Sequence, residues 1–242
     1  MAKNSNLHDA KKAKNDEFYT RMEDIENELK HYRKLFKGKV VYCNCDDPIE
    51  SNFCKHFMLK FNDYELKKLI CTCYSESGIA EMRGQCRAYK LEVTKVTDDT
   101  GDSAKEIIDN IIAENLLIPL EGNGDFRSEE CVKLLDESDI VITNPPFSLF
   151  REFVNLIMEH KKQFLIIGSQ NAITYKEIFP LIQNNEVWTG YQFGEMKFMV
   201  PKDSEPRKTM KVKIAQVFGL PVDYFLSEPD GESDSIGDGK SN

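Results

Sequence analysis

The chain of 242 residues contains no long apolar run. A membrane-spanning helix needs about 18 or more consecutive apolar residues, so we expect no membrane span and no membrane partner. The N-terminal stretch MAKNSNLHDAKKAKND also lacks the apolar core of a secretory signal. Together these two absences predict a cytoplasmic protein.

The chain also has fewer basic than acidic residues. Lys and Arg total 32 against 41 for Asp and Glu, which gives a formal net charge of −9. This balance argues against a general nucleic-acid coat protein, because binding to phosphates relies on a surplus of basic groups. It does not exclude an enzyme that meets nucleic acid through a locally basic face.

Histidine is scarce, with four residues, and the seven cysteines are odd in number. An odd number of cysteines without a secretory signal predicts reduced thiols. The pairs Cys43/Cys45 and Cys71/Cys73 have a spacing of two, which places both members on one face of a strand. No histidine has metal-ligand spacing to these cysteines, so we favour buried strand cysteines over a zinc site and expect no metal.

What the chain does contain is a succession of helical patterns and short apolar runs. The runs are continuous rather than alternating, as in strands that are covered on both faces of a parallel sheet. We therefore predict an α/β fold with a doubly wound, mostly parallel sheet. The expected helices cover residues 22–36, 51–59, 103–114, 128–135 and 149–159, and the expected strands cover 39–45, 69–74, 89–96, 139–143, 163–168 and 198–200.

One strand end carries an unusual tetrapeptide, Asn144-Pro145-Pro146-Phe147. Each proline lacks an N–H and has a fixed φ, so the segment is stiff and cannot continue a ladder of hydrogen bonds. It presents an amide and an aromatic ring beyond the carboxyl end of a strand, where open α/β sheets bind ligands. These features suit a holder for a planar polar ligand, and they suit a structural turn equally well.

The tetrapeptide has the form [DNS]-P-P-[YFW] of amino-group methyltransferases that use S-adenosylmethionine. Longer blocks extend the likeness, and in this order along the chain they resemble the EcoRI-type adenine-specific DNA methyltransferase family. The resemblance covers roughly residues 14 to 200 and implies the Rossmann-like fold of S-adenosylmethionine-dependent methyltransferases. The blocks are KNDEFYT (14–20), VYCNCDDPIESNF (41–53), GDFRSEE (124–130), DIVITNPPFSLFREFV (139–154) and FLIIGSQNAITYKEIF (164–179).

The resemblance implies a cofactor site for S-adenosylmethionine. It assigns the segment ending at Thr20 to the methionine part, the loop around Asp46 to the first cofactor loop, and Glu76 to the ribose hydroxyls. Asp125 should accept a bond from the cofactor's adenine amino group, with Phe126 packed on that ring. The implied cofactor-binding residues are Phe18, Tyr19, Thr20, Asp46, Asp47, Pro48, Ser51, Asn52, Phe53, Glu76, Asp125 and Phe126.

The implied catalytic residues are Asn144, Pro145, Pro146 and Phe147. The Asn144 side-chain oxygen and the Pro145 carbonyl can each accept one hydrogen of an adenine N6 amino group. Phe147 can stack on the base, which must leave the duplex to reach this pocket. The expected partner is therefore DNA with a flipped adenine, and the chemistry requires neither a metal nor a covalent enzyme intermediate. The oligomeric state stays open, with a monomer included.

The ends of the chain depart from the family. We expect a flexible arm at 1–15, a catalytic domain at 16–200, a divergent segment at 201–226 and a disordered acidic tail at 227–242. Residues 207–226 resemble the closing portion of a Cro/repressor-type helix-turn-helix module, with a short helix around Ile214, Val217, Phe218 and Leu220. Family members continue further, so we expect a truncated or altered C-terminus.

Three functions compete at this stage. The first is a site-specific N6-adenine DNA methyltransferase, complete or truncated, of the kind found in restriction-modification systems. The second is an amino-group methyltransferase that acts on RNA or protein, because Asn-Pro-Pro-aromatic motifs occur there too. The third is a remnant that binds the cofactor without turnover. The blocks outside the tetrapeptide favour DNA.

Overall fold

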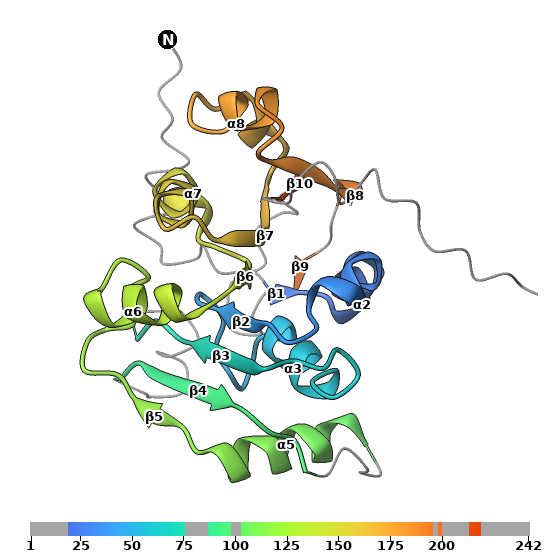
Figure 1. The fold of residues 1–242 in the computed structure, drawn as a ribbon, viewed down its shortest axis with the longest axis vertical. Helices are drawn as coiled ribbons and strands as arrows, with labels where there is room; N and C mark the ends of the chain where they lie inside the picture. The colour runs from blue at the N-terminus through green and yellow to red at the C-terminus, as the bar shows by residue number, and fades with distance from the viewer. Residues whose placement is uncertain (1–18, 76–86, 98–102, 196–197, 200–212, 219–242) are drawn as a thin grey trace, which may run out of the picture.

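The computed structural model describes residues 19–75, 87–97, 103–195, 198–199 and 213–218. Their centre is an eight-stranded sheet with the strand order β5-β4-β3-β2-β6-β7-β10-β8 (Figure 1). Its strands are β2 (Val40–Cys43), β3 (Lys68–Thr72), β4 (Tyr89–Val93), β5 (Ile118–Pro119), β6 (Ile140–Thr143), β7 (Gln163–Ser169), β8 (Trp188–Glu195) and β10 (Lys213–Phe218). A separate two-stranded sheet joins β1 (Tyr19–Thr20) to β9 (Phe198–Met199).

The large sheet is mostly parallel. The pairs β2–β3, β2–β6 and β6–β7 are parallel, whereas β4 and β10 run against all their neighbours. The chain leaves β2 for β3 on one side and returns to β6 on the other, so the strand order reverses between β2 and β6. This arrangement confirms the predicted doubly wound α/β fold, and such a sheet binds ligands beyond the carboxyl ends of the strands at that point.

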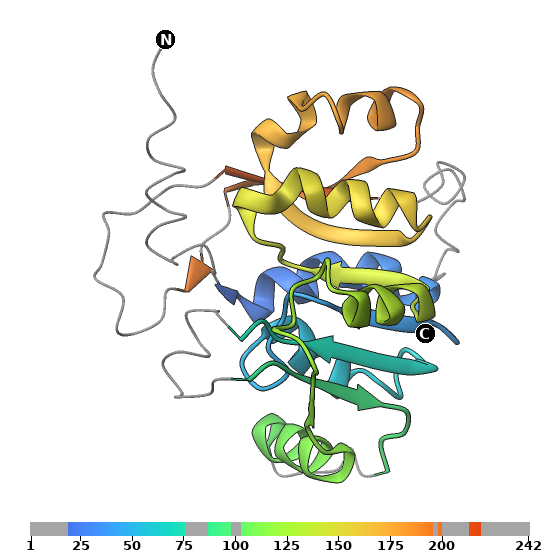
Figure 2. The same cartoon turned by 90° about the vertical axis from the view of Figure 1, so that its left-hand side faces the viewer.

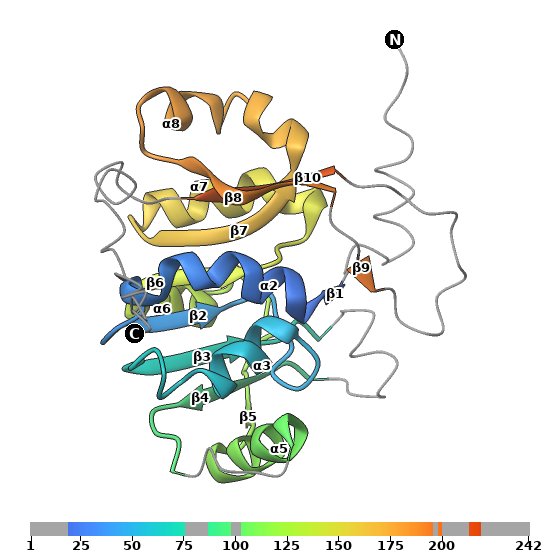
Figure 3. The ribbon, with the colours of Figure 1, turned by 90° about the vertical axis from the view of Figure 1, so that its right-hand side faces the viewer.

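Helices cover both faces of the sheet. Figure 3 views the face covered by α2 and α3, and Figure 2 views the face covered by α6 and α7. The predicted helix 22–36 is an α-helix whose second half tightens into a 3₁₀ helix, η1. The helical elements are α2 (Met22–Leu29), η1 (Lys30–Leu35), α3 (Asn52–Leu59), α5 (Ala104–Asn115), α6 (Glu129–Glu137), η2 (Phe147–Leu149), α7 (Phe150–Glu159), η3 (Gln170–Thr174) and α8 (Phe179–Gln183).

Two apolar clusters, one on each face, make up most of the core. In β2, Val41 and Cys43 belong to the cluster beneath α2 and α3, whereas Val40 and Tyr42 belong to the cluster beneath α6 and α7. Successive side chains of a strand point to opposite faces, so a strand that is covered on both sides needs apolar residues throughout. This explains why the strands near the site read as continuous apolar runs.

Local capping signals are confirmed at two helices. The Ser51 side chain accepts a bond from the backbone N–H of Phe53 at the start of α3. The Ser128 side chain accepts one from Cys131 at the start of α6. Each hydroxyl satisfies a backbone donor that the first helical turn leaves unpaired, which anchors the loop before the helix.

The helix predicted around Ile214–Leu220 is wrong. Residues Lys213–Phe218 form β10, which pairs antiparallel with β7 on one side and β8 on the other. A short segment can follow a helical spacing and still form a strand when two open strand edges offer it hydrogen bonds. The arm at 1–15 and the tail at 227–242 lie outside the described residues, so the domain boundaries stay predictions.

Within the described ranges, none of the helices combines the length and apolarity that crossing a bilayer requires.

Candidate active site

The loops after β2 and β6 meet because these strands are parallel neighbours. Asp46, which is 7% exposed, lies between them. Ser51 donates to Asp46 Oδ1 at 2.5 Å, and the Thr143 hydroxyl donates to Asp46 Oδ2. The backbone N–H of Asn144 also bonds to this carboxylate. Burial raises the pKa of Asp46 to about 6, against the three hydrogen bonds, which lower it.

The Asn144-Pro145-Pro146-Phe147 segment leads directly into η2 and then into α7. Pro145 is buried, and the Asn144 side-chain oxygen is buried as well. Phe147 begins η2, which runs on into α7, and its half-buried ring packs against the core cluster beneath α2 and α3. The structure therefore places the start of this segment beside Asp46, through the Asn144 backbone N–H, and packs the Phe147 ring against the core.

Asp47 shapes the same loop through its own set of partners. Its Oδ1 accepts from the backbone N–H groups of Ile49 at 2.8 Å and Glu50 at 3.1 Å. Its Oδ2 accepts from the Tyr89 hydroxyl at 2.6 Å. Both Asp46 and Asp47 thus have partners inside the protein. Pro48 is buried, and Phe53 belongs to the core cluster beneath α2 and α3. The expected contact of these carboxylates with cofactor stays a prediction.

Replacing Tyr89 with phenylalanine should lower the free energy of unfolding by about 1–3 kcal/mol, because a buried carboxylate oxygen loses its donor. Urea denaturation at neutral pH measures this change. Tyr175→Phe is the matched control, because the Arg151 guanidinium carbon lies 4.2 Å from the centroid of the Tyr175 ring and phenylalanine keeps that ring. We expect its free energy of unfolding to change by no more than about 0.5 kcal/mol. Equal stability of the two variants would contradict the role of the Tyr89 hydroxyl.

The N-terminal segment is held against the loop after β2. Asn52 Nδ2 donates to the Thr20 carbonyl at 2.7 Å. Figure 2 shows β1 and β9 beyond the arrowheads of β3 and β6, at the carboxyl edge of the sheet. Tyr19 pairs there with Met199 through the backbone, and Phe18 lies outside the described residues. The structure thus brings Thr20 and Asn52 together at this edge, and their contact with a cofactor stays a prediction.

Asp125 follows a glycine that packs unusually closely. Gly124 has a φ of +77°, and a Cβ there would lie 2.1 Å from the Cys73 carbonyl oxygen. Asp125 forms a two-point ion pair with Arg127, at 2.9 Å from Nε and 2.6 Å from Nη2, and this pairing holds the pKa of the carboxyl below its usual range. Arg127 also reaches Glu152 at 2.8 Å.

Phe126 is 4% exposed and packs edge-on against Phe153, with ring centroids 5.1 Å apart. The Arg127 guanidinium lies 5.2 Å from the Phe126 ring centroid. The core therefore already uses much of this ring, and its packing on a cofactor ring stays a prediction.

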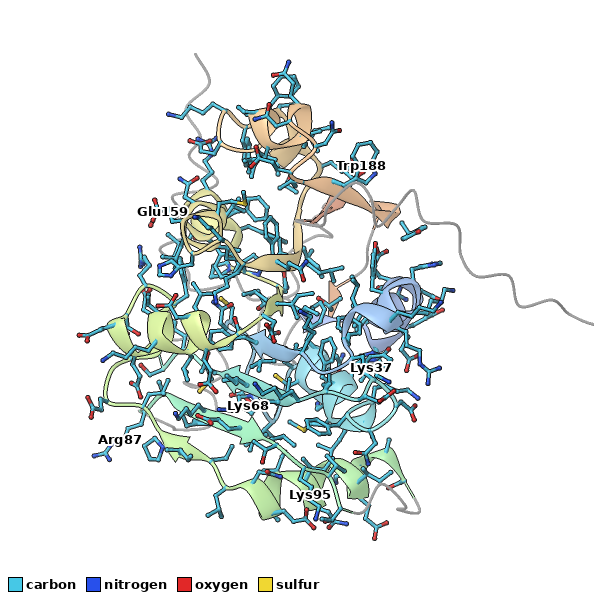
Figure 4. The ribbon with its side chains drawn as sticks, in the orientation of Figure 1. Lys37, Lys68, Arg87, Lys95, Glu159 and Trp188 are labelled. Atoms are coloured by element: carbon cyan, nitrogen blue, oxygen red, sulfur yellow. The ribbon has the colours of Figure 1, made fainter. Side chains whose placement is uncertain are left out.

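An open hollow of about 600 Å³ adjoins the Asp125 loop, lined by Ser75, Arg87, Leu120, Glu121, Gly122 and Asn123. Figure 4 shows Arg87 at the β4–β5 edge of the molecule, away from Trp188 in β8. Glu76, the expected ribose ligand, lies outside the described residues, directly after Ser75. The hollow lies beside the loop after β3 and the loop before Asp125, and its role in binding a nucleoside stays a prediction.

Sequence reasoning missed three residues of this site. Asn44 is buried directly after β2, and its side-chain oxygen has no partner within the described part of the chain. Thr143 and Tyr89 act through their hydroxyls on Asp46 and Asp47. Asn44 could have been found as a polar residue between a strand and an acidic loop, whereas nothing in the sequence marks the other two.

Three thiols converge beneath α3. The sulfur atoms of Cys43, Cys54 and Cys71 all lie within 4.8 Å of one another and are buried. Burial raises the pKa of all three thiols well above the ordinary value, which favours neutral groups that pack as apolar side chains. Cys43 in β2 and Cys71 in β3 are buried and free, as expected, and Cys73, directly after β3, is buried and free as well. Cys45 lies beyond the end of β2 and is only half-buried, so the prediction of a buried strand cysteine is wrong there. The expectation of no metal stays a prediction.

The chain is similar in sequence to known methyltransferases over most of its length. Residues 6–217 match the family model described as adenine-specific methyltransferase EcoRI. The chain is 47% identical to the type II methyltransferase M.EcoRI of Escherichia coli, over 84% of this chain and 61% of that protein. It is 43% identical to the type II methyltransferase M.MpnI of Mycoplasma pneumoniae, over 75% of this chain and 49% of that protein.

A third relative is the type II methyltransferase M.MgeORF184P of Mycoplasma genitalium, which is 38% identical over 80% of this chain and 54% of that protein. The chain thus spans about half to three fifths of the length of these relatives. A crystal structure of a putative RNA methyltransferase from Pyrococcus horikoshii aligns with a TM-score of 0.41 and 16% identity, over 85% of this chain and 87% of that one. That likeness is too weak to specify a function. On the extent of the family match, this chain belongs to the EcoRI family of adenine-specific methyltransferases.

Proposed function

We propose that this chain is the catalytic part of a site-specific DNA methyltransferase that transfers a methyl group from S-adenosylmethionine to the N6 amino group of adenine. The observation that carries the proposal is the bond from Thr143 to Asp46. It ties the Asn-Pro-Pro-Phe segment to the first cofactor loop at the point where the strand order reverses. A methyl donor and a methyl acceptor must lie next to each other at such a junction for transfer to occur.

The residues at the carboxyl edge fit the expected cofactor. The ribose hydroxyls and the adenine amino group of S-adenosylmethionine are hydrogen-bond donors, and they need acceptors. Asn44 Oδ1 and Thr20 Oγ1 are buried acceptor atoms that have no partner within the described residues. Asp125 adds an ionised carboxylate, which Arg127 holds in one orientation beside the open hollow. Bound S-adenosylmethionine supplies an activated methyl group on a sulfonium centre.

The catalytic segment would act on the base by positioning. An adenine amino group is a weak nucleophile, because its lone pair is delocalised into the ring. The Asn144 side-chain oxygen and the Pro145 carbonyl would accept its two hydrogens and favour a more tetrahedral nitrogen. Phe147 would stack on the flipped base and hold its plane. The amide oxygen of Asn144 would stabilise the positive charge that develops on N6 as the N–C bond forms, the S–C bond of the sulfonium breaks and one N6 proton is released.

A tritium-transfer assay tests this proposal. The chain is incubated with S-adenosylmethionine labelled on the methyl group and with DNA, RNA or protein as acceptor. We expect label in double-stranded DNA, recovered as N6-methyladenine after digestion. If none of the acceptors takes up label but calorimetry shows that S-adenosylmethionine binds, the chain is a remnant without turnover. If only RNA or protein takes up label, the assignment to DNA is overturned.

A further inference from the structure

Asp46 holds three donors from two loops. The Ser51 hydroxyl, at 2.5 Å, comes from the start of α3, whereas the Thr143 hydroxyl and the Asn144 backbone N–H come from the end of β6. Asp46 and Thr143 are 97 positions apart in the chain. Ser51, Thr143 and Asp46 are each at most 7% exposed, so water does not compete for these bonds.

The strand ladder does not provide this link. The β2–β6 register ends at Tyr42 opposite Val141, so Thr143 and Asn144 lie beyond the last residue pair between the two strands. On its other side, Thr143 still pairs with Ile166 of β7. The Asp46 carboxylate thus replaces the missing ladder bonds on the β2 side and fixes where the catalytic segment begins.

We propose that Asp46 is a positioning residue, whose carboxylate holds the Asn144 segment in register with the start of α3 and with the cofactor loop. This inference rests on the proposed function. It differs from the cofactor-contact role that the resemblance implies, because a buried carboxylate with three internal donors has little capacity left for a ligand. A displacement of about 1 Å at the reacting centre can cost about 100-fold in rate, so this link bears directly on turnover.

The link also has a pH dependence with a definite sign. The titratable groups that interact with Asp46 are Asp47, Cys43, Cys54 and Cys71. The negative charge of Asp47 raises the pKa of Asp46, and the negative charge of Asp46 in turn raises the pKa of each of the three thiols. Protonation turns one acceptor oxygen of Asp46 into a donor, so one of the three bonds is lost or reversed. Since burial raises the pKa of Asp46 to about 6, turnover should fall as the pH drops through about 6.

Stability should respond in the opposite direction at this group. The pKa of Asp46 is raised by folding, so its contribution to the free energy of unfolding is present at low pH and is lost as the pH rises through about 6. Protonation of Asp46 at low pH therefore stabilises the folded state, so unfolding driven by Asp46 does not account for a loss of turnover as the pH falls below about 6.

The experiment compares Asp46→Asn with Thr143→Val and with its matched control Thr143→Ser. Asparagine keeps the shape of Asp46 but replaces one of its two acceptor oxygens with an NH2 donor, whereas serine keeps the hydroxyl that valine removes. We expect Asp46→Asn and Thr143→Val to lower kcat on the order of 10- to 100-fold, with the Kd for S-adenosylmethionine changed less than about threefold. Thr143→Ser should stay close to wild type, and the double variant Asp46→Asn/Thr143→Val should be no slower than the slower single variant.

Two further measurements separate positioning from mere structural support. The decline of kcat below about pH 6 should disappear in Asp46→Asn, and backbone amide exchange in residues 143–150 should become faster in that variant. A raised Kd or KM for S-adenosylmethionine with unchanged kcat would overturn the proposal, as would wild-type kcat in Thr143→Val. If the wild-type chain labels no DNA, the proposed function fails, and amide exchange alone decides whether Asp46 holds this segment.

Discussion

Alanine in place of Asn144 should slow methyl transfer to adenine by about 100-fold or more, while the Kd for S-adenosylmethionine stays nearly unchanged. Loss of one oriented polar group that stabilises developing charge costs roughly 100- to 1000-fold in kcat in other enzymes. Asn144 follows β6 directly, and its buried oxygen lies in the stiff segment that Thr143 and Asp46 hold in place. Single-turnover transfer of labelled methyl groups to DNA measures the rate, and calorimetry measures cofactor binding.

Phe147→Ala should produce a loss of similar kind, because base stacking on an aromatic ring is worth about 1–3 kcal/mol. Its matched control is Phe179→Ala, which removes a 54% exposed ring at the start of α8 and should leave transfer unchanged. Thermal denaturation of each variant shows whether the fold is intact, since Phe147 also packs against the core. Wild-type rates in Asn144→Ala or in Phe147→Ala would contradict the assignment of this segment.

Gly124→Ala should lower the free energy of unfolding by about 3 kcal/mol and weaken cofactor binding with it. The φ of +77° disfavours any residue with a Cβ by about 1–2 kcal/mol. A Cβ at this position would also lie 2.1 Å from the Cys73 carbonyl oxygen and 2.9 Å from the Ala88 side chain, so backbone must move. That movement would shift Asp125, the next residue, away from the end of β3.

Gly122→Ala is the matched control for this prediction, since a Cβ at Gly122 meets nothing within 4 Å. Its free energy of unfolding should stay within about 0.5 kcal/mol of wild type. Urea denaturation of both variants, followed by titration with S-adenosylmethionine, gives the comparison. Similar stability of the two variants would show that the loop relaxes around the new methyl group without cost.

Much of the fold could be predicted from local pattern. Continuous apolar runs such as Ile140–Thr143 mark strands that are buried on both faces, and serines such as Ser51 and Ser128 mark helix starts. The stiffness of Asn144-Pro145-Pro146 follows from proline chemistry alone. These features depend on residues that are close in the chain, so a single sequence contains the information.

Other features depend on partners that are distant in the chain. The helix expected around Ile214 is a strand because β7 and β8 offer it two open edges. Asp125 was expected to accept a bond from the cofactor, which stays a prediction, and the structure adds that Arg127 holds its carboxylate at two points. Phe126 was expected to pack on a ring of the cofactor, which stays a prediction, and the structure adds its edge-on packing against Phe153. Neither spacing nor residue type shows which of several possible partners a side chain takes.

The sequence by itself determined that this chain is a doubly wound α/β protein with a rigid Asn-Pro-Pro-Phe segment at a strand end. It did so because burial on both faces and proline geometry leave direct traces in the order of residues. Only the tertiary structure decided that Asp46 joins this segment to the start of α3, and that Asp47 is held by Tyr89. Those bonds form where neighbouring strands end side by side, and strand adjacency is a property of the folded sheet rather than of any local stretch of chain.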